Sequence, residues 1–263
     1  MRLFLAEELI KCDMLGDPVS AILDGAGITV RCAPPPLRRY LGCFWEFAGE
    51  RAVAVETFPD GCAHFIVELA PGARPQAFIV GPRSTPGRYA KPAGMKVLGV
   101  RLRPGVGYLL LRKPMFRLLD RRLPYPAPAI VSLDEMEAHV SQRLQSAPVD
   151  ARVSAAVRTI SESSGDARID EVARQSGAGR RHLERLMRTW VGYSPKRLAR
   201  VARFQALLGS VDDSPPRDWT SLAAESYADQ AHLIREFSEF AGASPRRFYA
   251  ARHPDATSGR CGF

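Results

Sequence analysis

The sequence predicts an α+β protein with a β-rich N-terminal half and an all-α C-terminal half. Short runs of β-branched and aromatic residues, separated by Pro/Gly turns, fill the first half, and apolar residues recur at helical spacing in the second. The chain has 263 residues, 46% of them hydrophobic, which suffices for two cores. We expect a β-rich domain over 1–130, a linker helix over 131–149, a helical domain over 150–253 and a flexible tail over 254–263.

The strands of the first half are expected in five runs. They are "GCFWEF", "AVAVETF", "HFIVEL", "AFIVG" and "MKVLGVRL", with turns such as "FPDG", "GPRSTPG" and "RPGVG" between them. Many short strands with such turns favour a sandwich or a barrel over a parallel α/β sheet. The arginines of "VRLRPG" should then face solvent, with an anionic ligand as the alternative partner.

The second half begins after "PYPAP", which ends the β-like pattern. "SLDEMEAHVSQRLQ" follows as an amphipathic helix, in which Ser132 and Glu135 have the spacing of a capping box. Seven helices are expected after Asp150. They cover "ARVSAAVRTISESSG", "IDEVARQSG", "GRRHLERLMRTWVG", "SPKRLARVARFQALLGSV", "WTSLAAESY", "DQAHLIREFSEFAG" and "SPRRFYAARH".

A repeat lies inside this helical half. "HLERLMRTWVGYSPKR" (182–197) and "HLIREFSEFAGASPRR" (232–247) agree at seven of sixteen positions. In the first copy Leu183, Met187 and Trp190 fall on one helix face, and Arg181, Arg185 and Arg188 fall on the opposite face. Each copy thus has one buried and one free face, which is the pattern of a helix-turn-helix whose second helix enters the DNA major groove. The two units span about 168–197 and 218–247.

The shared Gly-x-Ser-Pro segment indicates how each unit ends. Gly192 and Gly242 can adopt the positive φ that ends a helix, while Ser194 caps the next one and Pro195 suits its first turn. Basic residues beside a helix N-terminus are natural contacts for phosphate. The residues expected to contact the DNA backbone are Arg180, Ser194, Lys196, Arg197, Arg246 and Arg247.

With these motifs, residues 150–252 resemble the AraC/XylS family of bacterial transcription regulators, which carry two helix-turn-helix units joined by a long helix. The resemblance implies that Arg181, Glu184 and Arg185 read base edges in the first unit, to which the free face adds Arg188. In the second unit Gln230, Ala231 and Arg235 fall on the matching positions. The sequence departs from the family at Ser226, where glycine is usual. The implied partners are double-stranded DNA and, as a further candidate, RNA polymerase.

The first half is similar, more loosely, to the cupin-like β-domain on a subset of these regulators, which implies a sensor for a small-molecule effector or a surface for homodimerisation. Trp45, Asp60, Cys62 and His64 are the candidate ligand residues. Only His64 and the distant His139 are available as imidazole ligands here, so we expect neither a metal nor a cofactor.

Composition limits the remaining functions. The net charge of +9 suits a polyanionic partner, no run is long enough for a membrane span, and five scattered cysteines indicate reduced thiols in the cytoplasm. We expect a transcription regulator and no enzyme. Two alternatives stay open: a DNA-anchored small-molecule or thiol-transfer enzyme using Cys62, and a non-specific nucleoid-type DNA binder.

Overall fold

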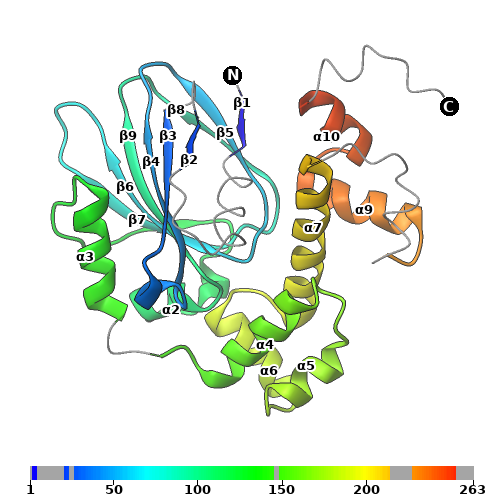
Figure 1. The fold of residues 1–263 in the computed structure, drawn as a ribbon. Coiled ribbons are helices and arrows are strands. Elements are labelled where there is room, and N and C mark those ends of the chain that lie inside the picture. The colour runs from blue at the N-terminus through cyan, green and yellow to red at the C-terminus, as the bar shows by residue number, and fades with distance from the viewer. Residues whose placement is uncertain (1, 5–20, 24–26, 145–147, 214–226, 253–263) are drawn as a thin grey trace.

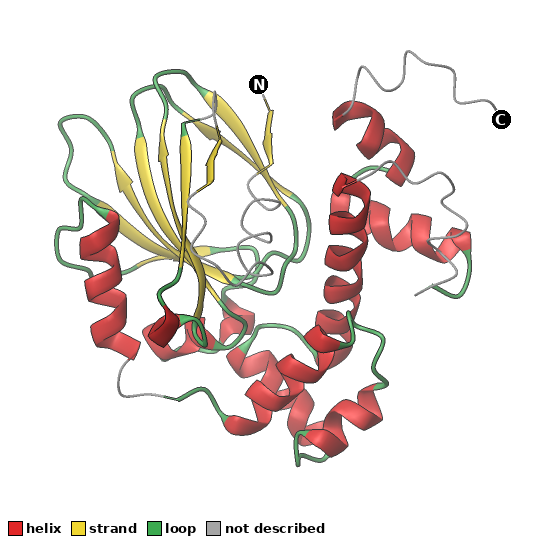
Figure 2. Cartoon of the chain, viewed as in Figure 1, coloured by secondary structure: helices red, strands yellow, loops and turns green. Residues whose placement is uncertain are grey.

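The structure is a computed structural model that describes residues 2–4, 21–23, 27–144, 148–213 and 227–252. A β-rich region comes first and a helical region follows, as the sequence predicted (Figures 1 and 2). The larger sheet has seven strands in the order β10-β7-β6-β9-β4-β3-β2, and a smaller sheet has the order β1-β5-β8. All pairs are antiparallel except β1 with β5.

The strands are short. Their bounds are β1 Arg2–Phe4, β2 Ala21–Leu23, β3 Ile28–Cys32, β4 Leu41–Ala48, β5 Val53–Thr57, β6 Ala63–Leu69, β7 Gln76–Val80, β8 Gly87–Lys91, β9 Lys96–Leu102 and β10 Arg122–Pro124. The five predicted runs correspond to β4, β5, β6, β7 and β9, which confirms them. Five of the described strands are not among the predicted runs, namely β1, β2, β3, β8 and β10. In β8 "GRYAK" is mostly exposed, and in β10 "RLP" is only three residues long.

Two cores cover the two faces of the larger sheet. Between the sheets, Trp45 and Phe47 of β4 pack with Val55 of β5 and Ile66 of β6. On the other face, Phe44 and other strand residues pack against helices α2 (Val106–Leu111) and α3 (Leu133–Leu144). Alternation along β4 therefore sends Trp45 toward the smaller sheet and Phe44 away from it.

One expected turn is a helix instead. "RPGVG" (103–107) contains Gly105, which has a φ of 95° and precedes α2, so "VGYLLL" (106–111) leaves the sheet as a helix. A 3-10 turn, η2 (Met115–Arg117), follows, and another, η1 (Pro35–Leu37), precedes β4. The predicted cap of α3 is confirmed, since Ser132 Oγ accepts a hydrogen bond from the Glu135 N–H at 3.2 Å.

The helical region follows with α4 Ala151–Glu162, α5 Ile169–Gln175, α6 Arg180–Trp190, α7 Pro195–Asp213, α9 Gln230–Ala241 and α10 Pro245–Arg252. The connecting helix α7 is longer than predicted. It runs to Asp213, two residues beyond the end of the predicted run at Val211, and Gly209 lies within the helix. Residues 219–226 of the helix expected over 219–227, including Ser226, and the tail over 254–263 lie outside the described residues, and Tyr227 is in a bend. Within the described part of the chain, no helix is long and apolar enough to cross a membrane.

The cysteines depart from the prediction. Cys32 is disulfide-bonded, whereas five reduced thiols were expected. Cys43 and Cys62 are buried and are not part of a disulfide.

Candidate functional site

The first helix-turn-helix unit consists of α5 and α6. Leu183 and Met187 are fully buried against α4 and α7, which fixes the face that α6 turns inward. The predicted base-reading residues of this unit, Arg181, Glu184, Arg185 and Arg188, are all exposed. The free face therefore exists as expected, and it carries three arginines.

The second unit has the same arrangement in α9. Leu233, Phe237 and Phe240 are fully buried, and Gln230, Ala231 and Arg235 are exposed. The helix begins at a capped N-terminus, where the Asp229 carboxylate accepts a hydrogen bond from the His232 N–H at 2.6 Å. Gly242 follows α9 with a φ of 75°, and Gly192 follows α6 with a φ of 93°, which confirms the role predicted for both glycines.

The sequence predicted Trp190 on the buried face of the first unit, but the structure does not place it in the interior of that unit. It is half-buried and packs against both the helical core and the β-domain core. Its ring lies 4.4 Å from that of Tyr108 in α2. Trp190 is thus part of the contact between the two regions.

The predicted phosphate contacts lie in different environments. Lys196, Arg246 and Arg247 are exposed at helix N-termini, and Ser194 Oγ caps α7 by accepting the Arg197 N–H at 3.2 Å. Arg180 is exposed but pairs with Asp170 at 3.1 Å. Arg197 is engaged on two sides: its guanidinium donates to Glu239 of α9 and to the Ser84 carbonyl of the β-domain, both at 2.5 Å.

Ion pairs between residues far apart in the sequence neutralise part of the positive charge of the helical region. Arg200 donates to Glu236 at 2.7 Å and also pairs with Glu239, and these bonds join α7 to α9. Burial raises the pKa of Glu239, but the hydrogen bonds from Arg200 and Arg197 outweigh it, and the net effect is a pKa below the usual range. Part of the positive charge is therefore structural, and the exposed part includes the arginines of α6 together with Lys196, Arg246 and Arg247.

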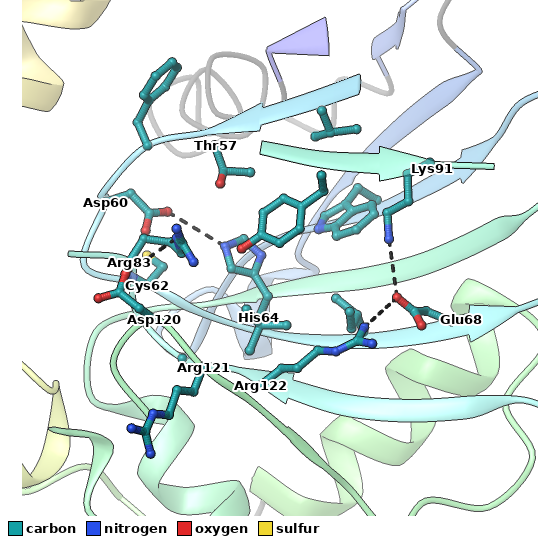
Figure 3. Close-up of a pocket in the computed structure, with 17 residues that line it drawn as sticks. Thr57, Asp60, Cys62, His64, Glu68, Arg83, Lys91, Asp120, Arg121 and Arg122 are labelled. Carbon is teal, nitrogen blue, oxygen red and sulfur yellow. Dashed lines mark hydrogen bonds and ion pairs between the residues drawn. The ribbon is translucent and has the colours of Figure 1, made fainter. Parts of the chain in front are cut away.

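The β-domain contains a cavity of about 340 Å³ between the two sheets (Figure 3). Its apolar wall includes Trp45, Val55, Phe58 and Ile66. The four ligand candidates from the sequence, Trp45, Asp60, Cys62 and His64, all line it. The other polar lining residues were not predicted; they are Thr57, Glu68, Arg83, Lys91, Asp120, Arg121 and Arg122. They lie on strands and turns that only the folded sheet brings together.

Charged groups gather at two places in this cavity. At one, Glu68 accepts from Lys91 at 3.4 Å and from Arg122 at 2.9 Å. At the other, Asp60 pairs with the buried Arg101 at 2.9 Å and lies 4.0 Å from His64. Arg101 is thus turned inward, contrary to the predicted solvated position.

The contacts of Asp60 and Arg101 determine the protonation state of His64. Burial lowers the pKa of His64, the Asp60 carboxylate opposes this and Arg101 adds to it, so the imidazole stays neutral at neutral pH. Asp60 also closes its turn by accepting the Cys62 N–H at 2.9 Å, as its place in "FPDG" predicted. Within the described ranges, no group of three or more His, Cys, Asp or Glu side chains is arranged to hold a metal ion.

The cavity adjoins the helical region. Phe58, at the end of the lining, belongs to the helical core and packs its ring at 5.5 Å from Phe248 and 6.3 Å from Phe204. Gln205 of α7 donates to the Pro59 carbonyl at 2.5 Å. The loop between β5 and β6 therefore connects the cavity directly with α7 and α10.

Comparison with known proteins adds the following. Residues 31–124 match the model of a family described as a domain of unknown function (DUF6597). No curated protein matches the sequence.

Among solved structures, the chain is similar to ToxT from Vibrio cholerae. An apo lysine-to-alanine variant from strain SCE256 has 11% identity and a TM-score of 0.40, covering 86% of this chain and 97% of that one. Wild-type ToxT of that strain with bound unsaturated fatty acid has 12% identity and a TM-score of 0.40, covering 79% and 93%. ToxT from strain O395 bound to (E)-4-(8-methylnaphthalen-1-yl)but-3-enoic acid has 11% identity and a TM-score of 0.40, covering 78% and 96%.

Proposed function

We propose that this protein is a sequence-specific, DNA-binding transcription regulator of the AraC/XylS type, controlled by a signal at its β-domain, and that it is not an enzyme. The observation that carries the proposal is the duplicated unit. Two helices of matching sequence, α6 and α9, each bury one apolar face and expose the residues expected to read bases. The exposed face of each helix does not pack against the rest of the protein, so an arginine on it is available to pair with guanine in the DNA major groove.

The proposal assigns the exposed residues two roles. Arg181, Glu184, Arg185 and Arg188 of α6, and Gln230, Ala231 and Arg235 of α9, contact base edges. Ser194, Lys196, Arg246 and Arg247, together with Arg180 and Arg197 once these leave their present partners, contact phosphates. Two reading heads in one chain serve two successive major-groove segments, so homodimerisation through the β-domain is an option and not a requirement. The regulator would act in the cytoplasm, where DNA and RNA polymerase are available to it.

The β-domain would supply the control. Its cavity has the size and the mixture of apolar wall and convergent polar groups that small-molecule sites show. Contacts through Phe58 and Pro59 give an occupant of the cavity a direct mechanical connection with α7. A small-molecule effector is therefore part of the proposal.

Selection of bound fragments from random duplex DNA by the full-length protein tests the function. We expect a motif of two halves separated by about one helical turn, the first half richer in guanine contacts. If no motif is enriched and the salt dependence is the same on every sequence, the protein is a non-specific DNA binder instead.

A thiol enzyme is the second candidate, because Cys62 and His64 both line the cavity. A nucleophilic cysteine reacts as its thiolate. The labelling rate of Cys62 with iodoacetamide, measured from pH 5 to 9, separates the two functions. A rate that is already high near pH 6 would favour the enzyme, and a slow rate rising only above pH 8 would favour the regulator.

A further inference from the structure

Arg83 lies in the cavity wall at a place, called here the Arg83 corner, where polar atoms lack hydrogen-bond partners. Its Nε is buried and has no hydrogen-bond partner among the described residues, and the nearest carboxylate oxygen, of Asp120, is 3.7 Å away, beyond hydrogen-bond range. Its Nη2 reaches only the Pro86 carbonyl, at 3.3 Å. A guanidinium N–H that is buried without a hydrogen-bond partner is costly unless a ligand completes it.

Thr57 and Gly87 complete this corner. Thr57 Oγ1 is likewise buried without a hydrogen-bond partner among the described residues. A Cβ placed on Gly87 would stand 2.8 Å from Thr57 Oγ1 and 3.0 Å from Arg83 Nη2, so both groups converge over this glycine. Figure 3 shows Thr57 and Arg83 at the same end of the cavity, away from Lys91 and Glu68. Two donors that converge on one point match a carboxylate.

The rest of the lining decides the class of ligand. Four cationic side chains line the cavity against three carboxylates, and Asp60 and Glu68 already have close cationic partners. Glu68 is shared between Lys91 and Arg122. The third carboxylate, Asp120, lies 3.7 Å from Arg83 Nε, which leaves this guanidinium in a loose ion pair, and Arg121 adds one further cation, while the remaining wall is apolar. An organic monoanion with a small apolar body fits both parts.

The backbone next to Arg83 holds the helical region. Tyr193, which precedes α7, donates its hydroxyl to the Arg83 carbonyl, and Arg197 donates to the Ser84 carbonyl at 2.5 Å. Asp120 fixes this segment, Gly81–Pro86, by accepting the Ser84 N–H at 2.8 Å and the Ser84 hydroxyl. Within this segment Gly81 and Arg83 line the cavity, and the Ser84 carbonyl occupies Arg197, a predicted phosphate contact.

We propose that the Arg83 corner binds an organic monoanion, and that binding opens the hydrogen bonds from Tyr193 and Arg197 to the segment Gly81–Pro86. The proposal rests on the proposed function, because it concerns how the cavity regulates DNA binding. An anion that pairs with Arg83 removes this guanidinium from the Pro86 carbonyl and weakens its attraction to Asp120. Both contacts hold the segment in the shape that Arg197 requires, so Arg197 becomes available to a DNA phosphate.

Linkage fixes the direction of the effect. A ligand shifts a conformational equilibrium only by its difference in affinity for the two states. Since the monoanion binds better when Arg83 has left Pro86, it favours the open state, and DNA, which needs Arg197, favours the same state. Monoanion and DNA should therefore increase each other's affinity by the same factor.

The first experiment tests the ligand class on the full-length protein. Benzoate, 4-phenylbutyrate and octanoate are compared with their neutral primary amides by thermal shift and by calorimetry. We expect at least one acid to bind and its amide to bind about tenfold more weakly or worse, as loss of a charge-assisted hydrogen bond implies. Arg83→Gln should lose the acid. Gly87→Ala, whose methyl group fills the corner, should lose it as well and serves if Arg83→Gln does not fold. Absence of binding by all three acids, or equal binding of acid and amide, overturns the proposal.

The second experiment tests the coupling. Affinity for a random-sequence 30-base-pair duplex is measured against salt, with and without the bound acid. We expect the acid to raise the affinity several-fold and to raise the salt slope by about one, the contribution of one further phosphate contact. Asp120→Gly should produce the same change without acid, since glycine tolerates the φ of 58° at this position while the hold on Ser84 is lost.

A matched pair of variants isolates Arg197. Arg197→Ala should abolish the effect of the acid, whereas Lys196→Ala, the exposed neighbour, should lower the affinity equally with and without acid. A decrease of affinity on addition of acid, or an effect that survives Arg197→Ala, overturns the coupling. If no variant or wild-type protein binds any duplex while the acids still bind, the proposed function fails instead.

Discussion

At the scale of single residues, exposed arginine distinguishes the two helices proposed to read DNA, α6 and α9. Three arginines lie on the free face of α6, and α9 offers Arg235 with Gln230. An arginine paired with guanine gives about 1–3 kcal/mol of discrimination. We expect Arg185→Ala to flatten one half of the selected motif and to cost more affinity than Arg235→Ala, which should flatten the other half. Binding-site selection with both variants measures this, and losses spread evenly over all positions would assign these arginines to affinity instead.

His64 gives a residue-scale prediction about pH. Its pKa is lowered in the folded protein by burial, against the attraction of Asp60 and with the help of Arg101, while in the unfolded chain it is near the ordinary 6.5. The unfolded state then binds more protons, so stability is full above about pH 6.5 and is lost as the pH falls through the folded pKa. His64→Gln should reduce the loss of unfolding free energy between pH 7.5 and 5.5 in urea titrations.

His139 makes this test specific, because burial and Arg143 lower its pKa too. Its contribution has the same sign and remains in the His64→Gln variant. The pH dependence should therefore shrink without disappearing. An unchanged dependence would place the acid sensitivity elsewhere.

At the scale of elements, the β5–β6 loop matters through Phe58. This ring is 4% exposed and lies in the helical core, not in the β-domain core. Phe58→Ala should cost about 3–5 kcal/mol of stability, as truncation of a buried phenylalanine does. Phe116→Ala, at a ring that is 42% exposed, should change it by less than about 0.5 kcal/mol. Urea unfolding followed by tryptophan fluorescence compares the two; equal effects would mean that Phe58 does not join the regions.

The sequence predicted those elements whose pattern is local. Leu183 and Met187 mark the buried face of α6 by their spacing alone, and Ser132 marks the start of α3. The helix over "VGYLLL" was not predicted, because Gly105 is as typical of a turn as of a helix start. The helix forms where this segment packs against the larger sheet, which no local pattern shows. The four ligand candidates predicted from the sequence all line the cavity. That Arg83 and Asp120 lie next to each other could not be predicted, since they are on different turns.

At the scale of the whole molecule, the two regions share residues that no local pattern reveals. Arg197 and Ser84 are 113 positions apart, and their hydrogen bond depends on the packing of α7 against the β-domain. Tyr193 and Phe58 also take part in this contact between the two regions. The sequence correctly placed Arg197 at a helix N-terminus, where phosphate binds, but could not show that a carbonyl of the other region occupies it. The folded protein therefore combines the surface proposed to bind DNA with a contact that engages one of its arginines.

This arrangement changes what a fragment of residues 150–253 should do. The sequence predicts that it folds and binds DNA alone. Without the β-domain, the site of Phe58 between Phe204 and Phe248 is open, so we expect the fragment to fold with lower stability. Arg197 has lost Ser84 as a partner, so the fragment should bind a random duplex more tightly than the full-length protein, with a steeper salt dependence. Circular dichroism checks the fold, and anisotropy titrations at several salt concentrations check the binding. A folded fragment that binds no better than the full chain would show that the β-domain places no restraint on Arg197.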